Sequence, residues 1–143
     1  MKRFISICCL IVLTVMLFAC SMSTKDDTKY SMNASIAYGA VDDSLDKTII
    51  TYELTISGKK NDIISIVAQE PLINREYLDQ MLENGPHSLK VKGDEKPYLE
   101  VTGSFVFDTA GKSKEEIDEM DLFQGIKIID RENNEYMLEF NKK

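Results

Sequence analysis

The sequence predicts a mainly β domain, an antiparallel β-sandwich of about seven strands with one or two short helical insertions. Apolar and polar residues alternate from residue 50 to residue 57, and this period of two is typical of a strand with one buried and one wet face. Other short apolar stretches follow, with turn-forming residues between them. Such short connections favour antiparallel pairing. Because two segments also carry helical patterns, an α+β fold is the alternative.

The first part of the domain predicts two further strands. Residues 32–38 alternate between apolar and small side chains, and residues 39–47 form an acidic loop before the alternating strand. Residues 58–62 are rich in turn formers. Residues 63–68 form an apolar run that only Ser65 interrupts, which predicts a strand near the centre of a sheet.

A helix is predicted in the middle of the domain. It begins after Asn74, which is a favourable N-cap residue. Leu78, Met81 and Leu82 would share one of its faces, and the Gly-Pro pair at residues 85–86 would end it.

Two more strands are predicted after this helix. The first covers residues 88–92 and is short. The second covers residues 98–107 and is the longest of the chain. Gly103 lies inside it, where a glycine often marks a β-bulge.

The C-terminal part predicts a second helix and a closing hairpin. Ser113 and Glu116 have the spacing of a capping box, which would open a short helix over residues 117–120. Residues 126–129 and 136–140 are apolar strands, and an Asn-Asn pair lies at the tip between them.

The N-terminus has the pattern of a leader. Lys2 and Arg3 follow the first methionine, and residues 4–19 are almost entirely apolar. A membrane-spanning helix needs about 20 apolar residues, so this run is short for one. Its length and its positive start are typical of a secretory signal peptide.

The leader ends in Leu17, Phe18, Ala19 and Cys20. This ending resembles the lipobox of bacterial lipoproteins, although Phe18 stands where that motif usually has a small residue. The resemblance implies that the Cys20 thiol receives a diacylglyceryl group and that the chain is cleaved between Ala19 and Cys20. An uncleaved N-terminal anchor helix is the alternative. Both place the domain outside the cytoplasm, at the cell membrane.

Processing would divide the chain into a signal peptide over residues 1–19, a lipidated tether over residues 20–29 and one domain over residues 30–143. Loss of Lys2 and Arg3 changes the formal charge from −7 to −9. An acidic chain of this kind argues against nucleic acid as a partner. With Cys20 bound to lipid, the domain keeps no thiol, which excludes thiol catalysis and cysteine–metal sites.

The strand rhythm, the lipobox and a Phe-rich strand at residues 103–108 together resemble the immunoglobulin-like envelope lipoproteins of Gram-positive bacteria. This resemblance implies an immunoglobulin-like sandwich. The cysteine pair and the core tryptophan of antibody domains are absent from the sequence.

Few residues predict chemistry. His87 is the single histidine, and no Gly-x-Ser-x-Gly elbow presents a serine, so no catalytic residue is assigned. Neither acidic run has the spacing of a calcium loop, and no metal ligand or cofactor is assigned. The two runs are Asp42, Asp43 and Asp46, and then Glu115, Glu116, Asp118, Glu119 and Asp121.

The sequence therefore predicts a membrane-anchored, extracytoplasmic lipoprotein that acts as a non-enzymatic binding or accessory module of the cell envelope. Its expected partners are the membrane, through the lipid on Cys20, and an envelope protein or peptide. Two alternatives stay open. One is a lipoprotein that binds a small ligand or a cation such as calcium, and the other is a lipoprotein that protects the cell against a cationic toxin or peptide.

Overall fold

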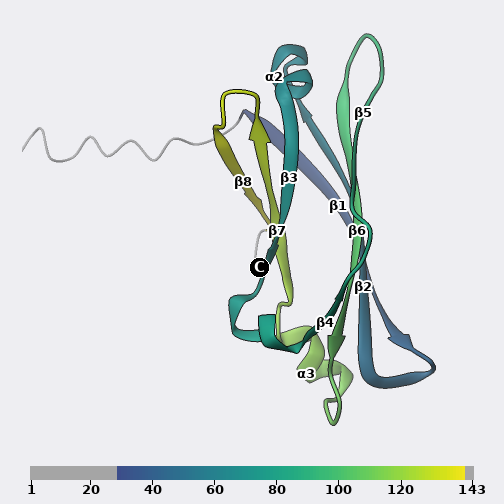
Figure 1. The fold of residues 1–143 in the computed structure, drawn as a ribbon. Coiled ribbons are helices and arrows are strands. Elements are labelled where there is room, and N and C mark those ends of the chain that lie inside the picture. The colour runs from purple at the N-terminus through teal and green to yellow at the C-terminus, as the bar shows by residue number, and fades with distance from the viewer. Residues whose placement is uncertain (1–28, 141–143) are drawn as a thin grey trace, which may run out of the picture.

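The computed structural model describes residues 29–140, and two antiparallel sheets packed face to face make up this segment (Figure 1). The predicted β-sandwich is therefore confirmed. The signal peptide, the lipobox, Cys20 and the tether up to residue 28 lie outside the described residues. Between residues 29 and 140, no helix is long and apolar enough to cross a membrane. Both sheets and the core described below come from this segment.

The larger sheet has five strands. Its order is β1 (Tyr30–Val41), β2 (Ser44–Gly58), β6 (Tyr98–Asp108) and then an edge shared by two short strands. These are β4 (Met81–Asn84) and β5 (Ser88–Lys92), which pair with different halves of β6. Together β4 and β5 act as one interrupted edge strand.

The smaller sheet has the order β3 (Ile66–Ile73), β7 (Phe123–Asp130) and β8 (Glu135–Glu139). With β4 and β5 counted as one strand, the two sheets hold seven strands in the order of a constant-type immunoglobulin domain. The predicted immunoglobulin-like arrangement is thus present, and the closing hairpin of β7 and β8 is confirmed.

The core lies between the inner faces of the two sheets. The alternation in β2 and β6 is confirmed, because Ile50, Leu54, Val101 and Phe107 are fully buried while their chain neighbours face outward. The buried apolar side chains of the core include Ile50, Tyr52, Leu54, Ile56, Leu99, Val101, Phe105, Phe107, Leu122, Phe123, Ile126 and Ile128.

The predicted loop over residues 39–47 is wrong, because β1 and β2 continue to a two-residue turn. Asp42 and Asp43 both have positive φ angles, of 56° and 59°, and aspartate tolerates this conformation better than most residues. The register shifts beside this turn, and residues 45–47 bulge from β2. The buried Thr109 supports the bulge: its hydroxyl donates to the Leu45 carbonyl at 2.6 Å, and its N–H donates to the Asp46 carbonyl.

The strand predicted over residues 63–68 is confirmed only from Ile66 onward, and its predicted central position is wrong. Its first half is a helical turn, α2 (Lys60–Ser65), and β3 begins only at Ile66 and lies at a sheet edge. The Ser65 hydroxyl donates to the Asp62 carbonyl at 2.6 Å, which supports the turn. The Ile63 side chain, which projects from this turn, is fully buried. The apolar run therefore packs at one end of the sandwich.

The helix predicted after Asn74 is much shorter than expected. Asn74 does cap a 3-10 helix, η1 (Arg75–Gln80), by accepting the N–H of Glu76. However, Met81 already belongs to β4 and lies opposite Phe107 in the larger sheet. Pairing with β6 therefore overrides the helical spacing of the apolar residues.

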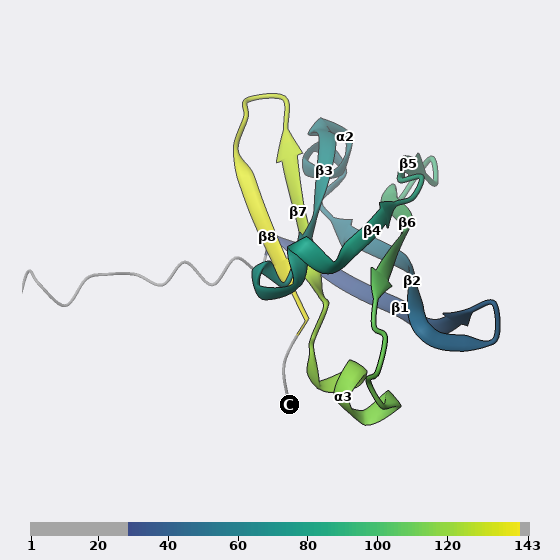
Figure 2. The same cartoon turned by 60° about the horizontal axis from the view of Figure 1, so that its bottom comes forward.

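The second predicted helix is confirmed as α3 (Lys114–Glu119), with both hydrogen bonds of the capping box between Ser113 and Glu116. Figure 2 shows α3 across one end of the sandwich, between β6 and β7. The bulge predicted at Gly103 is absent, because β2 and β6 pair in continuous register there.

Candidate ligand-binding groove

The outward face of the larger sheet has a floor of small side chains. Ala37 of β1 lies opposite Thr51 of β2, and Thr51 lies opposite Ser104 of β6, so the three form one row across the sheet. Ser35 and Thr102 extend this floor in the next row. Because none of these side chains is bulky, the middle of the face is hollow.

The first hollow has a volume of about 440 Å³. Its floor is the row just described, Glu53 lies within it, and Pro86 borders it on the side of the edge strand. Its lining is therefore polar and small, with one carboxylate.

The second hollow lies towards the β1–β2 turn and has a volume of about 750 Å³. Apolar side chains form part of its lining, namely Val41, Ile49, Leu82 and Val106. Charged side chains form most of the rest, namely Asp42, Asp46, Lys47, Glu83 and Asp108. This second hollow thus combines apolar surface with carboxylates.

The two hollows follow one another along the strands. Thr51 and Ile49 are successive outward positions of β2, and Ser104 and Val106 are successive outward positions of β6. We call the two hollows together the outer groove. It extends along β2 from Glu53 to Lys47, which is about 20 Å of extended chain.

The break between β4 and β5 shapes one side of the outer groove. The N–H of Gly85 donates to the Ser104 carbonyl at 2.9 Å, and a Cβ at residue 85 would collide with the Ser104 side chain. Glycine therefore lets the edge strand approach β6 closely. The next residue is Pro86, which has no N–H to continue the ladder. The Gly-Pro pair, predicted to end a helix, instead interrupts an edge strand.

The outer groove carries an excess of negative charge. Of the residues that the structure describes, Asp42, Asp46, Glu53, Glu83 and Asp108 supply five carboxylates to it, and Lys47 supplies the single cation. Among residues 29–140, none of these six groups forms an ion pair, and the ion pairs there involve Lys29, Lys92 and Lys127. Unneutralised carboxylates in a concave surface make its potential negative, which attracts cations.

His87 is not the free loop residue that its sequence context suggested. Its Nδ1 lies 2.8 Å from the Tyr52 hydroxyl, and its Nε2 is hydrogen bonded to the Asn84 side chain. The imidazole also packs against Phe105, with the ring centroids 5.1 Å apart. This cluster lies on the inner side of the sheet, below the floor of the outer groove.

Burial shifts the acid–base behaviour of both polar groups in this cluster. Desolvation lowers the pKa of His87 and raises the pKa of Tyr52 to about 12. The imidazole is therefore neutral at pH 7, and both of its nitrogens are engaged. These contacts fill the space beside Gly103. Because both imidazole nitrogens of His87 are hydrogen bonded, neither is directed at a substrate.

The two acidic runs named from the sequence are separated in the structure. Asp42 and Asp46 line the outer groove, whereas Asp43 does not. The second run lies on and beside α3. Over the described residues, no three His, Cys, Asp or Glu side chains are arranged to hold a metal ion.

The first described residue, Lys29, is already fixed to the domain. Its ammonium donates to the Tyr136 hydroxyl at 2.9 Å and forms an ion pair with Asp62 at 3.1 Å. The hydrogen bond to Tyr136 contributes most to raising the pKa of Lys29. The chain thus enters the domain beside α2 and β8, at the end away from the β1–β2 turn (Figure 1).

The proposed lipidation and cleavage residues, from Leu17 to Cys20, lie outside the described segment. Comparisons of this chain with protein-family models, with curated proteins and with solved structures return no match.

Proposed function

We propose that this chain is a lipid-anchored, extracytoplasmic, non-enzymatic binding module whose outer groove holds an extended cationic segment of an envelope protein or peptide. The observation that carries the proposal is the combination of five carboxylates, which form no ion pair among residues 29–140, with the apolar side chains of the second hollow. Lysine and arginine side chains suit such a surface, because they lay an apolar stem on apolar neighbours and keep a charged end for carboxylates.

The shape of the outer groove favours an extended ligand. About 20 Å of groove matches roughly six residues of extended chain. The floor rows of Ser35, Ala37, Thr51 and Ser104 leave room for a backbone to lie close to the sheet. The apolar residues Ile49 and Val106 follow further along the same line. A compact ion would contact only a small part of this surface.

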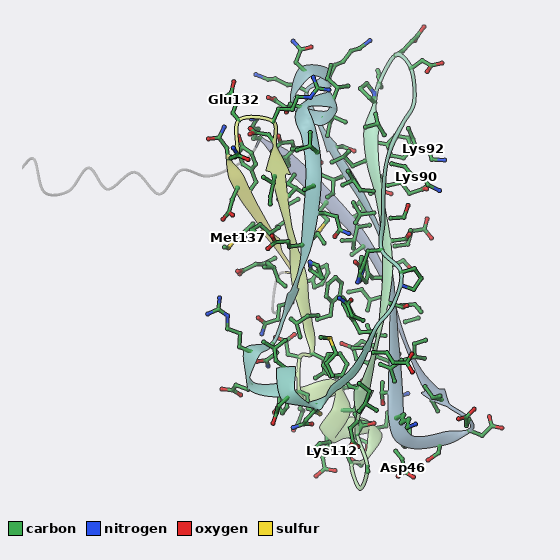
Figure 3. The ribbon with its side chains drawn as sticks, viewed as in Figure 1. Asp46, Lys90, Lys92, Lys112, Glu132 and Met137 are labelled. Atoms are coloured by element: carbon green, nitrogen blue, oxygen red, sulfur yellow. The ribbon has the colours of Figure 1, made fainter. Side chains whose placement is uncertain are left out.

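The position of the outer groove agrees with attachment at the N-terminus. Lys29 fixes the chain at the α2 end, whereas Asp46 and the second hollow lie at the opposite end (Figure 3). A lipid on Cys20, the attachment that the lipobox implies, would hold the protein at the membrane while the second hollow points away from the α2 end. The engaged nitrogens of His87 support a role without catalysis.

A peptide of alternating lysine and leucine, labelled with a fluorophore, tests the proposal by fluorescence anisotropy. We expect binding to the protein beginning at Ser21, and we expect it to weaken as salt is added. The double variant Glu53→Gln, Glu83→Gln should weaken binding by about tenfold, which corresponds to ~1.4 kcal/mol. Equal affinity of the variant and the unchanged protein would overturn the proposal.

Glu132→Gln supplies a control outside the outer groove. This residue lies in the turn between β7 and β8, far from Asp46 (Figure 3). It removes one carboxylate without touching the outer groove, so it should bind like the unchanged protein. If Glu132→Gln weakened binding as much as the groove variant, only net charge would attract the peptide. A protective lipoprotein that captures a cationic toxin would use the same groove and would differ only in the source of the ligand.

A further inference from the structure

The sandwich described between residues 29 and 140 exposes four sheet edges. They are β1 and the β4–β5 strand in the larger sheet, and β3 and β8 in the smaller one. An edge strand presents unpaired N–H and C=O groups, so it can pair with a strand of another chain. Proteins usually block such pairing with charged side chains, proline or bulges.

Three of these edges carry such blocks. β3 contains Glu70 and Pro71, and proline removes an N–H from the edge. The β4–β5 edge is broken at Gly85–Pro86 and carries Lys90 and Lys92 (Figure 3). The β8 strand is only five residues long, and a glutamate stands at each of its ends.

The remaining edge, β1, has no charged side chain and no proline, and its one register shift lies at its end, between Ala40 and Val41. Its twelve residues, Tyr30–Val41, include no lysine, arginine, aspartate, glutamate or proline. Within the described part of the chain it pairs only with β2, and most of its residues are exposed. At its end, Tyr38 is 40% exposed and the nearby Leu45 is 45% exposed. In a chain with a net charge of −7, a long uncharged edge is the least repulsive surface for a second copy.

We propose that β1 pairs antiparallel with β1 of a second copy of this chain, about a twofold axis. The two five-stranded sheets then join into one continuous sheet. β1 is self-complementary for this purpose, because its inward positions are apolar and its outward positions are small and uncharged. A second β1 therefore brings apolar residues to the apolar face and polar residues to the polar face. A twofold pairing also closes on itself, so it yields a dimer and not a fibre.

The geometry limits the register. Opposite residues of antiparallel strands point to the same face. The twofold axis must therefore pass between two copies of the same residue, one on each strand. Near the middle of β1 that residue is Ser35 or Ile36. With the axis at Ser35, Ala34 lies opposite Ile36 and Met32 lies opposite Tyr38, and each pair combines inward residues.

The oligomeric state of the protein beginning at Ser21 tests this inference, by sedimentation equilibrium. We expect a dimer at micromolar concentration. Ser35→Lys places a like charge on both strands and should weaken the dimer by about tenfold or more. Met137→Lys adds the same charge to the exposed β8 edge and should leave the dimer unchanged (Figure 3). A monomeric unchanged protein, or a dimer that only Met137→Lys weakens, would overturn the inference.

Cysteine crosslinking provides a second measurement that does not depend on weakening the dimer. The sequence after residue 20 has no cysteine, so one introduced thiol is unique. Opposite residues bring Cβ atoms close enough for a disulfide, whereas diagonal neighbours do not. We expect either Ser35→Cys or Ile36→Cys to give a covalent dimer on mild oxidation, and Met137→Cys to give none. Absence of a covalent dimer for both β1 variants would contradict the pairing.

Discussion

The Tyr52 hydroxyl lies 2.8 Å from Nδ1 of His87, over the position where residue 103 has no side chain. A Cβ at Gly103 would collide with both groups. Glycine at this position therefore leaves the space in which His87, beside the edge strand, forms a hydrogen bond with Tyr52 in the centre of the larger sheet.

Gly103→Ala should lower the free energy of unfolding by about 1–3 kcal/mol, because the added methyl forces the buried Tyr52 and His87 apart. Urea denaturation followed by tyrosine fluorescence measures the change. Gly39→Ala on β1 is the control, since its nearest contact would be 3.3 Å away, at Ile49. That control should change the stability little. If both variants were as stable as the unchanged protein, the crowding at Gly103 would be disproved.

The pH dependence of stability should report on His87. Burial lowers its folded-state pKa below 6.5, so the unfolded chain binds the proton more readily. Stability is therefore fully retained above pH 6.5 and declines as the pH falls below it. His87→Gln should flatten the curve of Tm against pH between about pH 5 and pH 7, because this is the sole histidine of the chain. An unchanged slope in the variant would contradict the burial of the imidazole.

Asp130 should stabilise the turn between β7 and β8. Its carboxylate accepts the N–H groups of Glu132 and Asn134, the Asn134 side chain and the Tyr136 hydroxyl. The Asn134 side-chain hydrogen bond is the main cause of its lowered pKa. A lowered pKa means that this stabilisation is present above pH 3.8 and is lost as the pH falls through the folded-state value.

Asp130→Asn should accordingly lower Tm at pH 7, and Tm should fall less steeply below pH 3.8 than in the unchanged protein. Differential scanning calorimetry across this range measures both effects. Glu139→Gln, at the far end of β8 and outside this network, is the control and should leave the curve unchanged. A variant that melts like the unchanged protein at pH 7 would refute the role of the carboxylate.

Cys20 should be the lipid attachment residue. When the full chain is expressed in a bacterium that processes lipoproteins, labelled palmitate should enter the protein, and the protein should sediment with membranes. Cys20→Ser should abolish the labelling, while Cys8→Ser and Cys9→Ser, which lie in the leader, should retain it. Labelling that persists in Cys20→Ser would disprove the lipobox assignment.

Much of the fold could be predicted from local pattern. The alternation around Leu54, the capping box at Ser113 and the C-terminal hairpin each depend on neighbouring residues, and each is confirmed. The errors arose where a distant strand decides the structure. Met81 has helical spacing from Leu78 but pairs with Phe107, and Ile63 belongs to a turn that only packing at the end of the sandwich explains.

The outer groove could not be predicted, because it exists only once the strands are in register. Ala37, Thr51 and Ser104 are far apart in the sequence and form no motif. Their small size at outward positions was the one visible indication. His87 does lie in a loop, between β4 and β5, but its hydrogen-bond partner Tyr52 comes from distant β2, which the local sequence could not indicate.

Mapping of peptide binding by NMR tests the central claim most directly. In a titration of the isotope-labelled protein beginning at Ser21 with the alternating lysine–leucine peptide, we predict the largest shifts at the amides of Thr51, Ser104 and Val106, around the outer groove. The amides of β7 and β8, in the other sheet, should move little. Shifts centred on β7 and β8, or no shifts at all, would contradict the assignment of the outer groove as the binding site.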